Sequence, residues 1–133
     1  MKVSVIMSCY NSQQTVGRAI ESILNQTLEN IELLICDDSS IDNTYETITK
    51  YKDLDKRVKV YKNIKNLGLT KTLNFLIEKA DGALIARQDD DDISLSERLK
   101  TQVNVLKEEN LDFITTRAKV LGSKKLIPGI SFN

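Results

Sequence analysis

The chain has 133 residues, enough for one domain with a substantial buried core. Its 41% apolar and 29% charged residues are typical of a globular protein, and 19 basic side chains balance 19 acidic ones. This balance argues against a nucleic-acid binder, and the longest apolar runs are too short to cross a bilayer. The N-terminal apolar stretch also lacks the length and cleavage site of a signal peptide.

Histidine is absent, which removes a Ser-His-Asp triad, a Cys-His pair and the usual zinc sites. A general base must therefore be a carboxylate, Lys, Tyr or Cys. A metal would be held mainly by oxygen ligands, which favours Mg²⁺ or Mn²⁺. Cys9 and Cys36 each end an apolar run. We expect buried thiols in a reducing cytoplasm, with a disulfide as the alternative.

The first half of the chain alternates between strand and helix patterns. Residues 3–9 are apolar and β-branched, which predicts a buried strand. Ser12 is the predicted cap of a helix that ends near Gln26 and has one apolar face. Residues 31–36 predict a second buried strand, and residues 44–53 predict a weaker helix.

The alternation continues through the second half. Residues 58–61 predict a short strand, residues 69–80 a helix closed by Asp81-Gly82, and residues 83–87 a fourth strand. Ser94 or Ser96 is the expected cap of the next helix.

After that helix, residues 112–116 predict a fifth strand, and residues 118–127 predict a small hairpin around Gly122-Ser123. The whole pattern is that of a parallel α/β sheet with helices on both faces. Right-handed crossovers place the carboxyl ends of all strands at one edge, where ligands of open α/β sheets bind.

Polar side chains follow four of the predicted strands at that edge. They occupy residues 8–12, 37–40, 63–68 and 89–92. Two Asp residues follow the second strand and four follow the fourth, which is more than helix capping needs, although a run of four alone fits a solvated turn. The surplus favours a divalent cation carrying a phosphorylated ligand, or ribose hydroxyls and a base N–H that donate to carboxylates.

Four motifs stand in order along the chain, each after its own strand. They are SVIMSCYN, DDSSIDNT, NLGL and RQDDDDISLSERL. Together they resemble the family 2 inverting glycosyltransferases with the GT-A fold, over nearly the whole chain. The resemblance implies a Rossmann-like GT-A domain, with a mostly parallel central sheet, helices on both faces and a truncated C-terminus.

The resemblance also implies roles for individual residues. Ser8 and Tyr10 would lie along the nucleotide base, and Asp38 would accept a hydrogen bond from it, typically from uracil N–H. Asn66 and Gly68 would lie near the nucleotide, where glycine permits close approach of the backbone.

The family's Asp-x-Asp motif would fall at Asp89 and Asp91. These residues would contact ribose and hold Mn²⁺ or Mg²⁺ against the two phosphates of a nucleotide sugar. The run of four Asp leaves an alternative register, in which Asp90 contacts ribose and Asp92 shares the metal, with Asp91 favoured as metal ligand. Arg87 is expected to pair with the acidic residues rather than with the ligand.

The family's acceptor-binding half and its catalytic carboxylate would follow residue 133, and nothing after Thr116 resembles a catalytic base motif. We therefore expect residues 1–133 to be a donor-binding domain that lacks the acceptor half and contains no catalytic residue. It would bind a nucleotide-diphosphate sugar, with UDP-sugar favoured, and transfer poorly or not at all alone.

In the whole enzyme the sugar would pass with inversion to a hydroxyl of a carbohydrate or lipid-linked acceptor, in bacterial surface polysaccharide synthesis. The expected location is the cytoplasm, at the inner face of the membrane where missing regions or partners provide attachment. Apolar surface near the last strand would favour a homo-oligomer.

Three other classes of protein fit parts of the pattern. A receiver-type phosphoacceptor signalling domain also has five parallel strands and Mg²⁺, but its acids follow strands one and three, not two and four. A nucleotidyltransferase needs a Gly-rich basic loop after the first strand, which SCYNSQQTV lacks. A non-catalytic interaction module with a GT-A-like fold stays open, because no catalytic base is found.

Overall fold

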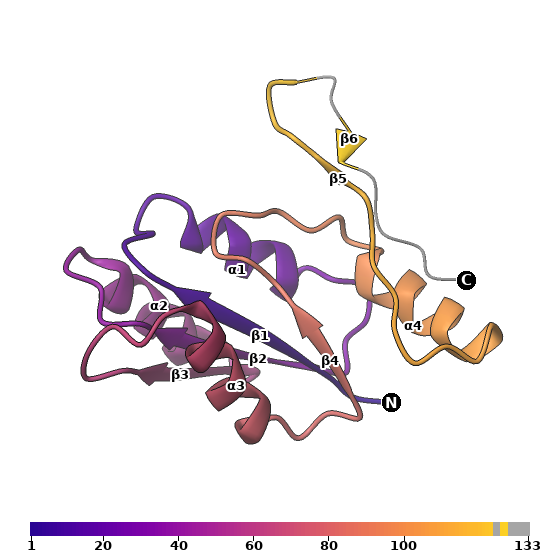
Figure 1. The fold of residues 1–133 in the computed structure, drawn as a ribbon, viewed down its shortest axis with the longest axis horizontal. Helices are drawn as coiled ribbons and strands as arrows, with labels where there is room; N and C mark the ends of the chain where they lie inside the picture. Colours follow the sequence, from indigo (N-terminus) through magenta and orange to yellow (C-terminus); the bar gives the residue numbers. More distant parts are fainter. Residues whose placement is uncertain (124–125, 128–133) are drawn as a thin grey trace.

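The computed structural model describes residues 1–123 and 126–127, where strands and helices alternate before a short hairpin (Figure 1). In chain order the elements are β1 (Val3–Cys9), α1 (Val16–Leu24), β2 (Ile31–Asp37), α2 (Thr44–Leu54), β3 (Val58–Lys62), α3 (Leu69–Lys79), β4 (Leu84–Arg87), α4 (Arg98–Glu108), β5 (Ala118–Lys119) and β6 (Leu126–Ile127). The four predicted helices and the first four predicted strands are confirmed. Within these ranges, no helix has the length and apolar character needed to cross a bilayer.

The main sheet has the strand order β3-β2-β1-β4, and all its pairs are parallel. The carboxyl ends of the four strands therefore meet at one edge, as predicted. β4 pairs only with the first half of β1, from Val3 opposite Leu84 to Ile6 opposite Arg87. Because β4 ends early, the chain after Arg87 runs on toward the loop that follows β1.

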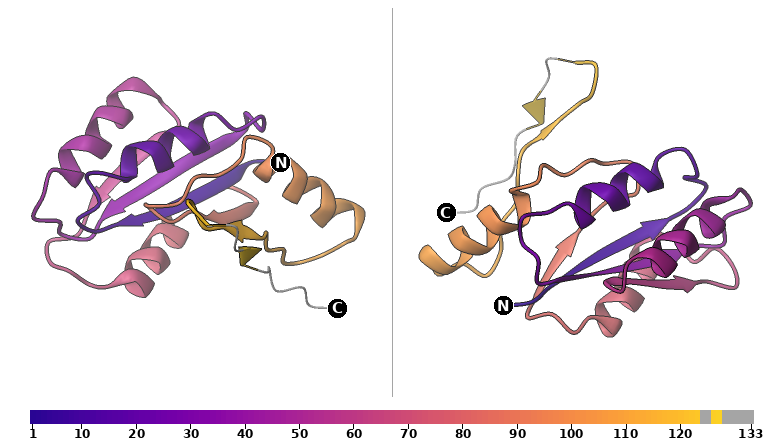
Figure 2. Two further views of the ribbon diagram at one scale, coloured as in Figure 1. Left: turned by 90° about the horizontal axis from the view of Figure 1, so that it is seen from above. Right: turned by 180° about the vertical axis from the view of Figure 1, so that it is seen from behind.

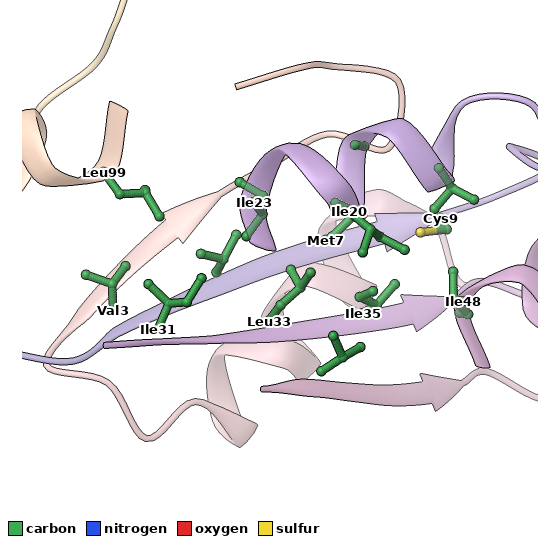
Figure 3. Close-up of a cluster of buried hydrophobic side chains, with 14 of the residues drawn as sticks. Val3, Met7, Cys9, Ile20, Ile23, Ile31, Leu33, Ile35, Ile48 and Leu99 are labelled. Atoms are coloured by element: carbon green, nitrogen blue, oxygen red, sulfur yellow. The ribbon is translucent and has the colours of Figure 1, made fainter. Parts of the chain in front are cut away.

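The two faces of the sheet carry separate apolar clusters. On one face, Met7, Leu33 and Ile35 pack with side chains of α1, α2 and α4 (Figure 3). On the opposite face, Ile6 and Leu34 pack against α3, which lies across the sheet from α1 and α2 (Figure 2). Each fully buried Leu or Ile contributes roughly 1.5–3 kcal/mol. Burial on both faces explains why β1 and β2 read as nearly continuous apolar runs.

The two cysteines lie in different clusters, Cys9 with α1 and Cys36 with α3. Both are free and buried, so the expectation of buried thiols is confirmed and the disulfide alternative is wrong. Burial raises the pKa of Cys36 to about 12 and also raises that of Cys9. Both side chains are therefore neutral packing groups at neutral pH.

The prediction that Ser12 caps α1 is wrong. The helix begins at Val16, and the residue before it, Thr15, makes no side-chain cap. Ser12 uses its carbonyl instead, which accepts hydrogen bonds from the N–H groups of Thr15 (3.0 Å) and Val16 (2.9 Å). A turn therefore precedes the helix.

Neither Ser94 nor Ser96 caps α4, which begins at Arg98 without a side-chain cap. The Ser94 hydroxyl donates to Gln88 at 2.6 Å. The Ser96 carbonyl accepts a hydrogen bond from the Thr27 N–H at 3.0 Å. Both serines therefore anchor the loop before α4 to other elements, which the capping prediction did not consider.

The predicted fifth strand at residues 112–116 is also wrong. This segment is irregular, and Phe113 at its centre is 66% exposed. An apolar run forms a strand only where a neighbouring strand pairs with it, and the segment instead lines a groove beside α3 and β4. The hairpin that follows is confirmed for the described residues, because β5 and β6 pair antiparallel, while residues 124–125 lie outside them.

Candidate functional site

An open pocket of about 450 Å³ lies at the carboxyl edge of the sheet, within the size range of small-molecule sites. Its lining residues are Ser8, Tyr10, Asp38, Asn66, Gly68, Leu69 and Asp90. The structure thus brings together six of the seven residues predicted to contact substrate. Asp89, the seventh, is not part of this lining, and the contact roles themselves stay predictions.

Asp38 is the buried acidic centre of this pocket, with an exposure of only 2%. Its carboxylate accepts hydrogen bonds from the N–H groups of Leu67 (2.8 Å) and Gly68 (2.9 Å) and from Nδ2 of Asn63 (2.7 Å). Burial alone would raise the pKa of Asp38, but these donors hold it below its ordinary value. Asp38 therefore carries its charge at neutral pH and fixes the turn before α3. The sequence does not predict this second role, because no local pattern links Asp38 to Leu67 and Gly68, which lie 29 and 30 positions further along the chain.

Gly68 has the backbone angles φ 85° and ψ 162°, a region that is essentially restricted to glycine. A Cβ atom there would meet open space. Glycine is therefore required by the backbone angle, which directs the Gly68 N–H onto Asp38, rather than by crowding within the protein.

The loops after β1 and β2 are joined to each other by side-chain hydrogen bonds. The Asn11 N–H donates to Ser40 Oγ at 2.9 Å, and Asn11 Oδ1 accepts from the Ile41 N–H at 3.0 Å. The Gln13 N–H donates to Asp42 at 3.2 Å. The two loops form one rim, next to which the side chain of Tyr10 stays 49% exposed and available to a ligand.

The acidic run after β4 forms a turn that the Asp92 N–H closes on the Asp89 carbonyl at 3.3 Å. The Asp89 carboxylate pairs with the Arg87 guanidinium, at 2.8 Å from Nε and 3.1 Å from the second nitrogen. The expected pairing of Arg87 with the acidic residues is therefore confirmed. Arg87 and Asp89 both line the larger groove described below and not this pocket.

Asp90 is the acid of the run that lines the pocket, and it accepts a hydrogen bond from the Tyr10 N–H at 3.3 Å. Burial and the neighbouring charge of Asp91 raise the pKa of Asp90, while the Ser12 hydroxyl and the Tyr10 N–H oppose that rise. Asp91 itself is exposed. The turn therefore concentrates negative charge beside the pocket.

Gln88 is a site residue that sequence reasoning missed. It is 2% exposed and immediately precedes the acidic run. Its Nε2 donates to the carbonyls of Asp89 (3.1 Å) and Asp92 (2.9 Å), and its Oε1 accepts from Ser94 (2.6 Å) and Arg98 (3.0 Å). A single glutamine beside four aspartates carries no signal that would have identified it.

The donor chemistry of the acidic turn fits a hard divalent cation, because all its side chains offer oxygen ligands. In the part of the chain that the structure describes, no three His, Cys, Asp or Glu side chains converge as a metal site. Mg²⁺ in phosphate-handling sites is commonly held by one or two carboxylates together with substrate phosphates and water. The residues fit a metal that a phosphorylated ligand helps to hold.

A larger groove of about 1090 Å³ runs between α3, β4, α4 and residues 112–118. Much of its lining is apolar, including Leu73, Ile77, Ile85 and Phe113. Asp89 and Asp92 also line this groove, whereas Asp38 and Asp90, which follow different strands, line the smaller pocket. The smaller pocket is therefore the candidate site. Self-association through exposed apolar surface stays a prediction.

A parallel α/β sheet with a ligand-sized pocket and an acidic turn at its carboxyl edge has the arrangement in which open α/β domains bind their ligands. The family model described as "Glycosyl transferase family 2" matches residues 4–128. The chain therefore belongs to glycosyltransferase family 2. The family resemblance expected from the motifs is confirmed, and membership argues against a receiver-type domain and a nucleotidyltransferase.

Curated relatives agree with this assignment. The EpsE protein of Bacillus subtilis (strain 168) is 44% identical over 108 residues, which cover 80% of this chain and 39% of EpsE. The Escherichia coli UDP-Glc:alpha-D-GlcNAc-diphosphoundecaprenol beta-1,3-glucosyltransferase WfgD is 33% identical over 125 residues, or 94% of this chain and 49% of WfgD. The chain thus spans less than half the length of these two relatives.

Among solved structures, S. aureus TarS 1–349 in complex with UDP-GlcNAc matches with a TM-score of 0.76 and 29% identity. The match covers 83% of this chain and 32% of the TarS chain. The chain has the GT-A fold of these glycosyltransferases, as expected.

Proposed function

We propose that residues 1–133 bind the nucleotide of a UDP-sugar together with Mn²⁺ or Mg²⁺. The observation that carries the proposal is that Asp38, Tyr10 and Asp90, from three separate strand ends, line one pocket. The complex of TarS with UDP-GlcNAc supports it, as does the UDP-glucose donor in the name of WfgD.

The pocket suggests a role for each side chain toward the nucleoside. The exposed ring of Tyr10 offers a face on which a base can stack, beside Ser8. Asp38 lines the pocket as a charged carboxylate and is the proposed acceptor for a uracil N–H, beside the three N–H groups and the Thr72 hydroxyl that already stabilise its charge. Asn66 and Gly68 also line the pocket.

We propose the register in which Asp90 contacts the ribose and Asp91 ligates the metal. Asp90 lines the pocket, whereas Asp89 is paired with Arg87 and lines the larger groove. When bound, Mn²⁺ or Mg²⁺ supplies a Lewis acid that stabilises the leaving diphosphate. The two aspartates orient the donor against that cation. Asp89 as a second ligand is the alternative that the family motif implies.

For the whole enzyme we propose inverting transfer to a hydroxyl of a carbohydrate or lipid-linked acceptor, in surface polysaccharide synthesis at the inner face of the membrane. The diphosphoundecaprenol acceptor in the name of WfgD supports this context. We assign no catalytic base to the described residues. The 133-residue chain is accordingly proposed to bind donor without efficient transfer.

Calorimetry of the 133-residue protein with UDP, in the presence and absence of Mn²⁺, tests the proposal. We expect UDP to bind with Mn²⁺ and to bind more weakly without it. Acetyl phosphate with Mg²⁺ is the negative control, because it tests a phosphoacceptor instead. If no nucleotide binds under any condition, the proposal is wrong and the non-catalytic interaction module is favoured.

A further inference from the structure

We infer that Gln88 is a positioning residue that holds the acidic turn in the shape that presents Asp90 to the pocket and Asp91 to a cation. The inference rests on the proposed function and adds to it a residue that contacts neither nucleotide nor metal.

The first observation is where the Gln88 amide lies. The turn is closed by the Asp92 N–H and the Asp89 carbonyl at 3.3 Å, which is long for such a bond. Gln88 Nε2 donates to the carbonyls of the same two residues, at 3.1 and 2.9 Å. Both N–H groups of one side chain therefore fasten the two ends of the turn, and they do so at shorter distances than the bond that closes it.

The second observation is that the other end of the amide is equally constrained. Gln88 Oε1 accepts from the Ser94 hydroxyl at 2.6 Å and from the Arg98 guanidinium at 3.0 Å. The Ser94 N–H donates in turn to Ser22 Oγ on α1. Gln88 thus connects the turn to α1 and α4, and its buried amide uses its full hydrogen-bonding capacity. These hydrogen bonds fix the rotamer of Gln88 and so restrict the conformation of the turn that it holds.

The third observation concerns charge. Four adjacent carboxylates repel one another. Hydrogen bonds to the backbone of the turn, such as those of Gln88, offset this repulsion without using the carboxylate groups. An Arg or Lys in place of Gln88 would neutralise the charges that attract a cation. A neutral amide bonds the backbone and leaves the charges of Asp90 and Asp91 available.

The chain offers a matched control in Gln26, a second buried glutamine with 5% exposure. Its Nε2 donates to the carbonyls of Ser22 (2.9 Å) and Leu95 (2.8 Å), and its Oε1 accepts from the Leu99 N–H (3.0 Å). It has the same chemistry as Gln88 and a similar number of bonds. It anchors the start of α4 rather than the acidic turn.

The test compares Gln88→Met with Gln26→Met, since methionine keeps the length of the side chain and removes its hydrogen bonds. Calorimetry measures UDP affinity with Mn²⁺, thermal unfolding measures stability, and backbone NMR measures the amides of Asp90 and Asp91. We expect Gln88→Met to weaken Mn²⁺-dependent UDP binding about tenfold or more and to shift both amides. Gln26→Met should lose comparable stability and leave binding and these amides nearly unchanged.

Equal loss of binding in the two variants overturns the inference, and so do unchanged turn amides in Gln88→Met. If Gln88→Met does not fold, Gln88→Asn keeps the amide but shortens its reach, and it should also lose affinity. Wild-type binding by Gln88→Asn would then overturn the inference. Failure of the wild-type protein to bind UDP with Mn²⁺ is a different result, which removes the proposed function and this inference with it.

Discussion

The backbone N–H of Tyr10 donates a hydrogen bond of 3.3 Å to the carboxylate of Asp90, across 80 positions of sequence. This bond exists because β4 is shorter than β1 and ends opposite Ile6, so the chain after β4 passes beside the end of β1. The proposed pocket is therefore a product of unequal strand lengths in a parallel sheet. The hydrogen bond also makes the four aspartates of the acidic run inequivalent, because Asp90 is the one that accepts from the Tyr10 N–H.

The first prediction separates Asp90 from Asp89. Asp90→Asn should lower UDP affinity in the presence of Mn²⁺ about tenfold or more, because a charge-assisted hydrogen bond is worth roughly 1.5–3 kcal/mol. Asp89→Asn should have a smaller effect, because Asp89 is paired with Arg87. Calorimetry of both variants measures the difference. The exposed Asp53→Asn on α2 is the control and should bind like wild type.

A larger loss in Asp89→Asn than in Asp90→Asn would contradict this register and favour the one in which the family motif begins at Asp89. Measuring Asp91→Asn in the same series tests the proposed metal ligand. Its loss of affinity should be confined to conditions with Mn²⁺.

The second prediction concerns Asp38. Asp38→Asn replaces a charged acceptor of three N–H donors by an amide, and it should cost about 1–3 kcal/mol of unfolding free energy. Because Asp38 is also proposed to contact the base, UDP binding should weaken with and without metal. Urea denaturation and calorimetry check the two effects. Unchanged UDP binding at reduced stability would show that Asp38 serves only the turn of Leu67 and Gly68.

Much of this arrangement followed from sequence because parallel strands have a simple geometry. Apolar runs predict β1 and β2, and the rule that ligands bind at the carboxyl edge groups Ser8, Asp38 and Gly68, which line one pocket in the structure. These predictions depend only on element order and on which residue follows each strand.

What could not be predicted depends on side-chain contacts between distant segments. Which aspartate of the acidic run lines the pocket depends on the contacts of Arg87 with Asp89 and of Gln88 with Asp92. These contacts depend on the path of the loop, which the sequence pattern does not specify. The serines expected to cap helices bind other loops instead, as Ser94 does with Gln88. The segment around Phe113 has the pattern of a strand, but pairing needs a neighbour that local pattern does not report.

The third prediction uses the edge of the sheet opposite the pocket. Glu32 is 3% exposed and pairs with Lys59 at 2.8 Å and Lys2 at 3.1 Å, while its carboxylate also accepts the Asp81 N–H. Burial alone would raise the pKa of Glu32, but the lysines and the hydrogen-bond donors lower it from 4.5 to about 2. The folded state therefore favours the charged form of this residue.

This lowered pKa predicts how stability depends on pH. The contribution of Glu32 is fully present above pH 4.5 and is lost as the pH falls toward about 2. Glu32→Gln should lose about 1–3 kcal/mol at pH 7, because the donors around this buried position lose a charged acceptor while both lysines keep Asp81 as a partner, and its stability should fall less steeply between those pH values. Urea denaturation across this range measures both. Identical pH slopes in the variant and wild type would refute the assignment, and Glu46→Gln, exposed on α2, is the control.

The last prediction compares two glycines with different surroundings. A Cβ on Gly82 would lie 2.6 Å from the N and Oγ atoms of Ser4 and 3.0 Å from the Lys2 carbonyl, so the turn after α3 would have to move off β1. Gly82→Ala should cost about 1–3 kcal/mol. A Cβ on Gly17 in α1 would lie 3.1 Å from the Tyr51 hydroxyl, which has to give way by only a few tenths of an ångström, and helix propensity favours alanine by roughly 0.5–1 kcal/mol. Thermal unfolding should therefore show a clear loss for Gly82→Ala and little or none for Gly17→Ala; equal losses would mean that the turn adapts freely.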